Sequence, residues 1–159
     1  MTGSDTGRII KLTLDERTVI RRSPEVEQER RVAIYDLIEE NQFVPDGIDA
    51  GPYSLHLRLE ESRLLFDIRD AQDQPLTTVT LALTPFRNLV REYFMICESY
   101  FQAIKTATPS RIETLDMARR GIHDEGSEQL RERLAGKITT DFGTARRLFT
   151  LICVLHIRG

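Results

Sequence analysis

A dense group of ionisable residues lies in the stretch RRGIHDEGSE, residues 119–128. On a continuous helix Asp116, Arg119 and His123 are neighbours, because residues three and four positions apart share a face. An arginine beside a histidine could bind an anion, with the histidine as the proton donor. The favoured interpretation is structural, because a buried charge needs a partner. In that case Arg119 pairs with Asp116 at a seam between helices, and His123 donates to a backbone carbonyl.

The two glycines in this stretch, Gly121 and Gly126, decide whether it forms one helix or two. The apolar residues keep the same helical phase on both sides of the glycines, which favours one helix over residues 110–135. Gly126 points into the apolar sector, where its missing side chain would let another helix approach closely. Gly121 lies outside that sector. The residues that carry the shared phase are Ile112, Leu115, Ala118, Ile122, Leu130 and Leu134.

A second group of arginines, Arg146 and Arg147, lies in the sequence TARRLF. Together with Arg119 and Arg120 they could form a basic patch if the two helices are neighbours, and such a patch could contact RNA or a ribosome. The net charge of −3 favours solvated arginines instead and makes nucleic acid an unfavoured partner.

Cys153 and His156 are three residues apart in ICVLHIRG and could share a metal ion. With His123 they would supply three zinc ligands. One Cys-x-x-His pair lacks the second pair that structural zinc sites usually have, so we predict a core thiol and a core histidine, with no metal and no cofactor. No glycine-rich phosphate loop or nucleophilic serine motif is found in the sequence.

The elements that must position these residues follow from periodicity and from helix-start signals. Alternation predicts an N-terminal strand and a meander of three strands, which together form a small antiparallel sheet. About four helices cover one face of this sheet, and the C-terminal helix, apolar almost all round, is central. This is an α+β fold. The predicted strands span residues 8–16, 53–60, 63–70 and 76–84, and the predicted helices span 23–43, 85–105, 110–135 and 140–159.

The helix predicted over residues 85–105 carries a broad aromatic and aliphatic face. This face could line a ligand pocket, but its helical spacing makes packing against the core the default. We therefore expect Tyr93, Phe101 and Ile104 to be buried.

Length and composition indicate one soluble domain. The chain has 159 residues, of which 40% are hydrophobic and 30% charged. We predict a disordered tail over residues 1–7 and a single α+β domain over 8–159. The N-terminus has no apolar signal, the longest apolar run (148–157) is half a membrane span, and the two cysteines lie in apolar segments. These features predict a cytoplasmic protein with free thiols and no membrane association.

Four segments resemble a known family of short alphaproteobacterial proteins, the uncharacterised protein family number 0262. The resemblance extends from about residue 8 to residue 159. It implies a bacterial, cytoplasmic origin, and it brings no activity, ligand or catalytic residues. The segments are RRSPEVEQERRVAIYDLIEEN, GPYSLHLRLEESRLLFDIRD, RRGIHDEGSEQLRERLAGKI and DFGTARRLFTLICVLHIRG.

Three functions are compatible with these observations. The leading hypothesis is a small binding or regulatory module that engages a protein partner or a small anionic ligand. Its expected surface consists of Asp116, Arg119, His123, Arg146 and Arg147. The first alternative is an enzyme acting on an anionic, for example phosphorylated, substrate, with His123 as acid or base and Arg119 as the anion clamp. An enclosed His123 with both ring nitrogens bonded internally would exclude that role. The second alternative is an RNA- or ribosome-associated protein.

Overall fold

The structure, a computed structural model, describes residues 6–15 and 24–155, apart from the side chains of residues 25, 26, 154 and 155. The expected tail over residues 1–7 lies largely outside this part of the chain. Gly7 is buried, and its carbonyl oxygen accepts a hydrogen bond from the amide of Phe43. The elements are β1 (Ile9–Leu14), α2 (Pro24–Glu39), β2 (Phe43–Pro45), β3 (Tyr53–Glu60), β4 (Arg63–Asp70), β5 (Pro75–Ala82), the 3-10 turn η2 (Thr84–Phe86), α3 (Arg87–Thr106), α4 (Pro109–Leu134), β6 (Ile138–Thr140) and α5 (Phe142–Leu155).

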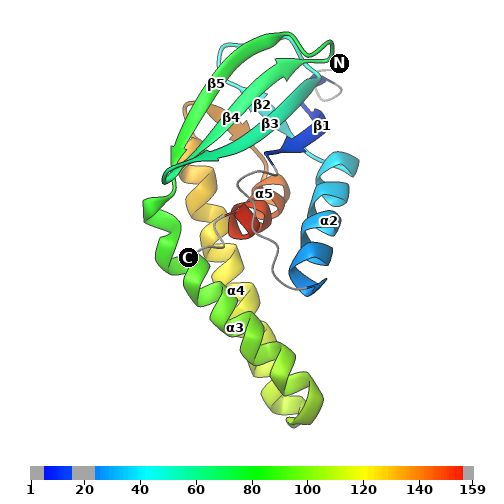
Figure 1. Ribbon diagram of the computed structural model, residues 1–159, viewed down its shortest axis with the longest axis vertical. Coiled ribbons are helices and arrows are strands. Elements are labelled where there is room, and N and C mark those ends of the chain that lie inside the picture. Colours follow the sequence, from blue (N-terminus) through cyan, green and yellow to red (C-terminus); the bar gives the residue numbers. More distant parts are fainter. Residues whose placement is uncertain (1–5, 16–23, 156–159) are drawn as a thin grey trace.

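The predicted α+β fold is confirmed, with a four-stranded sheet in the order β1-β3-β4-β5 above a layer of helices (Figure 1). The meander β3-β4-β5 is antiparallel, as expected. The N-terminal strand β1 pairs with β3 in parallel, so the sheet is mixed and not wholly antiparallel. The chain crosses from β1 through α2 before it enters β3, and such a crossover returns the strand in the same direction.

The sheet has one covered face and one open face, as the alternation predicted. The side chains on the open face form a row of ion pairs, in which Arg69 bridges Asp67 and Asp73 at 2.8 and 3.0 Å. His56 approaches the other oxygen of Asp73 at 3.0 Å. The opposite face carries Leu55, Leu57, Phe66 and Ile68 into the core.

The first long helix is shorter than predicted. We expected a helix over residues 23–43, but α2 ends at Glu39 and Phe43–Pro45 forms β2, which pairs with β6. Asn41 explains the end of α2, because its Nδ2 donates to the carbonyl of Leu37 (2.6 Å) and to that of Ile9 (3.0 Å). The side chain of Asn41 thereby caps the last turn of α2 and connects it to β1. The chain then leaves the helix, and Phe43 is buried in the core.

The central position predicted for the C-terminal helix is confirmed. Helix α5 lies below the sheet between α2 and the pair α3–α4 (Figure 1). Among its described side chains Ala145, Leu148, Phe149, Leu151 and Ile152 are buried. The helix starts after Asp141, whose carboxylate accepts from the amide of Thr144 at 2.9 Å.

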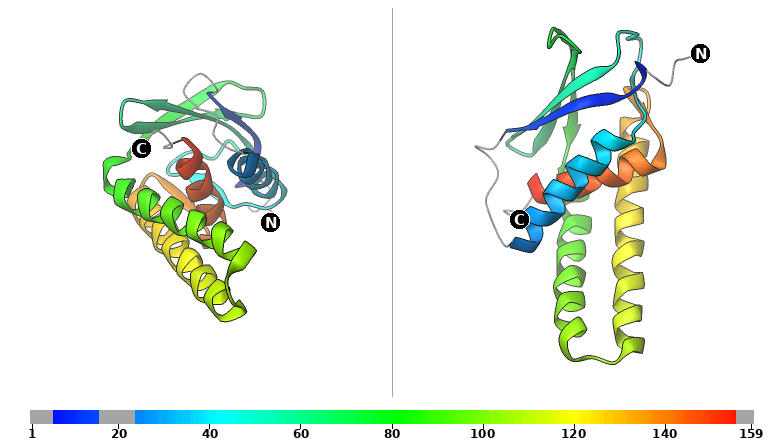
Figure 2. Two further views of the ribbon diagram at one scale, coloured as in Figure 1. Left: turned by 60° about the horizontal axis from the view of Figure 1, so that its bottom comes forward. Right: turned by 90° about the vertical axis from the view of Figure 1, so that its right-hand side faces the viewer.

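Helices α3 and α4 form an antiparallel hairpin that projects away from the sheet (Figure 2). Helix α4 continues past both glycines, as predicted, and the Thr108 side chain caps its first turn by accepting from the Arg111 amide at 3.2 Å. A Cβ placed on Gly126 would lie 2.2 Å from Phe149 Cζ of α5, whereas one on Gly121 would meet nothing within 4 Å. Gly126 is therefore the point of close approach between α4 and α5, as the sequence predicted.

Candidate functional site

Arg119 lies between α3 and α4 and has partners on both helices. Its guanidinium forms an ion pair with Asp116 one turn earlier and lies 5.0 Å from the centre of the Tyr100 ring. Asp116 also accepts from Arg120 at 2.7 Å. The hydrogen bond from Arg119 lowers the pKa of Asp116 below its usual value. This pair matches the structural interpretation of the sequence, in which Arg119 and Asp116 hold a seam between helices.

His123 is enclosed by the helix layer and is only 8% exposed. Its Nε2 lies 2.8 Å from Thr150 Oγ1, and its Nδ1 lies 3.4 Å from Ser127 Oγ. Thr150 donates its own proton to the carbonyl of Arg146, so we assign the proton of the shared bond to His123 Nε2.

The environment of His123 keeps its ring neutral. Burial, reinforced by the positive charge of Arg146, lowers the pKa of His123 to about 4. The rings of Tyr93 and Phe149 lie 5.3 and 5.2 Å from it, centre to centre. The enclosed imidazole donates to Thr150 through Nε2, whereas Nδ1 faces the hydroxyl of Ser127, which donates to the His123 carbonyl at 2.7 Å. In this structure His123 joins α4 to α5 through the hydroxyl of Thr150, and not through the backbone carbonyl that we predicted from the sequence.

Arg146 and Arg147 have different partners. The Nε of Arg146 lies 3.3 Å from Asp124 of α4, whereas Arg147 donates to the carbonyl of Glu40 at the end of α2, at 3.1 Å. The structure thus brings Arg146 to the α4 side, near His123, and directs Arg147 toward α2. These contacts of Arg146 and Arg147 are therefore with different helices, α4 and the end of α2.

The candidate zinc ligands Cys153 and His123 are both buried, and His156 lies outside the described residues. Among residues 6–15 and 24–155, no three His, Cys, Asp or Glu side chains are grouped so that they could hold a metal ion. Burial raises the pKa of the Cys97 thiol to about 11 and that of the Cys153 thiol well above its usual value. Both cysteines are free, and their raised pKa values indicate the thiol form at neutral pH.

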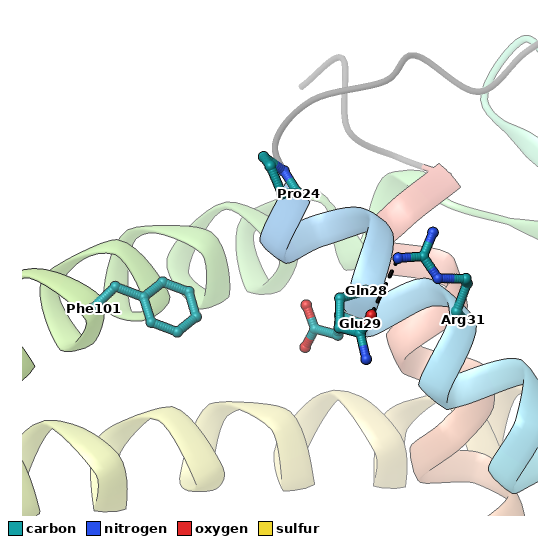
Figure 3. Close-up of a pocket in the computed structure, with 5 residues that line it drawn as sticks. All are labelled: Pro24, Gln28, Glu29, Arg31 and Phe101. Atoms are coloured by element: carbon teal, nitrogen blue, oxygen red, sulfur yellow. Dashed lines mark hydrogen bonds between the residues drawn. The ribbon is translucent and has the colours of Figure 1, made fainter.

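A hollow that the sequence did not predict lies between α2 and the outer half of α3. It has a volume of about 590 Å³ and is lined by Pro24, Gln28, Glu29, Arg31 and Phe101. We call it the α2–α3 groove. Figure 3 shows the Glu29 carboxylate and the Phe101 ring facing each other from the two helices, with Arg31 on the far side of α2 hydrogen-bonded to Gln28.

Phe101 corrects a prediction from the sequence. Helical phase placed Phe101 and Ile104 on the packed face of α3, but these side chains are 46% and 50% exposed. The predicted burial of Tyr93 is confirmed. The difference is that Tyr93 lies over α5, whereas the outer half of the hairpin extends beyond the helices that would cover it (Figure 2).

A chain of polar contacts connects the α2–α3 groove to the predicted site. Tyr93 donates its hydroxyl proton to Glu29 Oε2 at 2.9 Å, and the Arg119 guanidinium interacts with the same hydroxyl. Burial, with the negative charge of Glu29, raises the pKa of Tyr93 far above its usual value. The chain Glu29–Tyr93–Arg119–Asp116 therefore ties α2, α3 and α4 together through charged and neutral partners.

We expect Tyr93→Phe to lower the free energy of unfolding by about 1–2 kcal/mol, because it leaves a half-buried carboxylate without its donor. Urea denaturation would measure the change. Tyr100→Phe on the same helix is the matched control. It keeps the ring below Arg119, and we expect it to cost less than about 0.5 kcal/mol. Equal losses in the two variants would show that the Glu29–Tyr93 bond contributes nothing specific.

The structure is that of a small α+β protein in which ionisable residues such as Asp116, Arg119 and Glu29 join helices. None of the helices described in 6–15 and 24–155 has the length and apolar character needed to span a membrane. The family model of the uncharacterised protein family UPF0262 matches residues 6–158, and the chain belongs to this family. The resemblance noted from the sequence is thereby confirmed.

The relatives are similar over nearly their whole length. A UPF0262 protein of Paramagnetospirillum magneticum is 60% identical over 152 residues, covering 96% of this chain and 97% of the relative. One of Rhodospirillum rubrum is 61% identical over 155 residues, covering 98% and 96%. One of Rhodopseudomonas palustris strain TIE-1 is 59% identical over 152 residues, covering 96% and 93%. No solved structure matches the chain.

Proposed function

We propose that this protein is a cytoplasmic binding module that captures a protein partner with the outer part of its α3–α4 hairpin and the adjoining face of α2. The observation that carries the proposal is the apolar character of this projecting surface. We call residues 95–117, the outer part of the hairpin, the arm. It exposes four large apolar side chains, Met95 (61%), Phe101 (46%), Ile104 (50%) and Met117 (62%).

The exposed apolar side chains of the arm contribute little to the stability of the fold. Their presence on the surface is therefore better explained by contact with a protein partner. The core lies between the sheet and α5, and the arm extends away from it (Figure 2). Exposed apolar groups that are gathered on one projection are typical of partner surfaces. Methionine and phenylalanine suit such a surface, because they offer large contact areas to an irregular partner.

The face of α2 across the groove extends the same surface. Gln28 and Arg31 line the groove, and Val32 and Tyr35 follow four residues later on the same side of the helix. Both Val32 and Tyr35 are exposed. Asp116 lies in the part of α4 that belongs to the arm, and Arg119 follows three residues later on the same helix, so part of the surface expected from the sequence adjoins the proposed interface. His123, Arg146 and Arg147 lie outside the arm, where they contact Thr150, Asp124 and Glu40, respectively.

A protein partner is favoured over a small anionic ligand. Asp116 already occupies Arg119 and Arg120, and Asp124 lies beside Arg146. An anion would have to displace these two carboxylates, at the cost of three ion pairs. Apolar contacts with the arm require no such exchange.

Site-specific photo-cross-linking in the cells that produce the protein tests the proposal. With benzoylphenylalanine at position 101 or 104, we expect one discrete cross-linked protein. The same probe at position 44 is the control, because Val44 is an exposed apolar residue of β2 outside the arm. We expect the double variant Phe101→Ser/Ile104→Ser to lose the partner in co-purification while it remains folded. Cross-links at position 44 alone, or an unchanged yield from the double variant, would overturn the proposal.

A further inference from the structure

We propose that the α2–α3 groove is a receptor for a basic side chain, a lysine or arginine that a segment of the partner protein inserts between Glu29 and Phe101. This inference rests on the proposed function and specifies the chemistry of the partner. Its basis is the opposition of a carboxylate and an aromatic ring across a solvent-open hollow of about 590 Å³ (Figure 3).

The Glu29 carboxylate has an unused acceptor oxygen. Its Oε2 accepts from Tyr93, which fixes the side chain in the groove. Among the described residues no lysine or arginine pairs with Glu29, and the neighbouring Arg30 forms its ion pair with Glu27 at 3.4 Å. A half-buried carboxylate beside apolar walls has lost part of its hydration. An ion pair with a cation therefore stabilises it more than it would stabilise a carboxylate in water. In the part of the chain that the structure describes, the lining of the groove contains one carboxylate, Glu29, and one guanidinium, Arg31, with no ion pair between the two.

The walls fit the rest of a basic side chain. Phe101, nearly half exposed, presents its ring on the other side of the groove, and Pro24 adds a second apolar surface. An aromatic ring attracts an ammonium or guanidinium group, and apolar walls accommodate the methylene stem of lysine or arginine. Arg31 also lines the groove, but its guanidinium donates to Gln28 and not to Glu29 (Figure 3).

A phage-displayed library of random twelve-residue peptides is the probe, selected on the full-length protein. We expect the enriched peptides to share one lysine or arginine next to apolar residues. In fluorescence anisotropy, replacing that residue by norleucine or citrulline should weaken binding about tenfold, as should Glu29→Gln in the protein. Combining the two changes should add little further loss, because both remove the same contact.

Matched variants separate the receptor role of Glu29 from its structural role. Glu29→Gln keeps an acceptor for the Tyr93 hydroxyl, and thermal unfolding would verify that it remains folded. Glu27→Gln, two residues away, should leave peptide binding unchanged. Phe101→Ala should weaken binding several-fold, whereas Val44→Ala, at an exposed apolar residue of β2 outside the arm, should not. A charge exchange, Glu29→Lys in the protein with glutamate in the peptide, should restore binding.

Two kinds of failure are distinguishable. Enrichment of acidic or uncharged peptides, an empty selection, or unchanged peptide binding by Glu29→Gln would overturn the receptor inference alone. Cross-linking at position 101 could yield a partner whose capture is insensitive to Glu29→Gln. In that case the proposed protein-binding function holds, but the inference that the groove receives a basic side chain is wrong. Absence of any cross-link at positions 101 and 104 would overturn the proposed function itself.

Discussion

Gly126→Ala lowers the free energy of unfolding by about 1–3 kcal/mol, in spite of the higher helix propensity of alanine. The new Cβ would lie 2.2 Å from Phe149 Cζ, 2.4 Å from Cε1 and 2.7 Å from Cε2. Phe149 is fully buried, and the rings of Phe86, Tyr93 and His123 surround it. The ring cannot move aside without displacing these neighbours. Urea denaturation, compared with the parent protein, would measure the loss.

Gly121→Ala on the same helix is the control for this effect. Nothing lies within 4 Å of a Cβ at Gly121. The alanine should therefore stabilise the protein by roughly 0.5–1 kcal/mol through helix propensity alone. In addition, Phe149→Leu should be less harmful in the Gly126→Ala background than in the parent protein, because the smaller side chain leaves room for the methyl group. If Gly126→Ala stabilised the protein as much as Gly121→Ala, α4 and α5 would not be in close contact there.

Acidification destabilises the protein through His123 between about pH 6.5 and pH 4. Burial lowers the pKa of this histidine from 6.5 to about 4 in the folded state. As the pH falls, the unfolded chain therefore binds a proton first, and the stability that the neutral ring provides is lost. The contribution is complete above pH 6.5, declines below it and is gone near pH 4. The interval between the two pKa values corresponds to a loss of up to about 3 kcal/mol.

The measurement is the free energy of unfolding in urea at a series of pH values from 7 to 4. His123→Gln should be less stable than the parent at neutral pH and should lose most of the slope between pH 6.5 and pH 4.5. Ile152→Val, a conservative change in the core of α5, should keep the slope of the parent. An identical slope in His123→Gln would contradict a buried, neutral histidine. Asp73 and Asp116 have lowered pKa values and affect stability at lower pH, through loss of their ion pairs.

Local patterns in the sequence predicted much of the fold. The meander of three strands follows from strict alternation, and Thr108 caps α4 because its hydroxyl reaches a nearby amide. The continuous apolar phase of α4 was sufficient to predict the close approach at Gly126. It also placed Asp116 beside Arg119. These features depend on residues within a few turns of one another, which is why periodicity captures them.

The features that sequence reasoning missed depend on contacts between distant segments. Asn41 ends α2 by donating a hydrogen bond to the carbonyl of Ile9, which lies 32 residues earlier, and no local pattern in the sequence predicts that partner. The predicted antiparallel pairing of β1 was wrong, because the direction of β1 relative to β3 depends on the path of the crossover between them. Phe101 and Ile104 have the same spacing as the buried residues of α3, and only the length of the hairpin relative to α2 and α5 leaves them exposed.

By itself the sequence determined the α+β class, the unbroken α4 helix, the glycine contact and the family of this protein, because these depend on local periodicity and on residue identity. Only the tertiary structure decided that His123 is enclosed and neutral, and that Arg146 and Arg147 face different helices. It also decided that Glu29 faces Phe101 across a groove. The physical reason is that burial and charge pairing are properties of packed surfaces. A side chain's helical phase specifies the direction in which it points, and the neighbouring elements decide what it meets there.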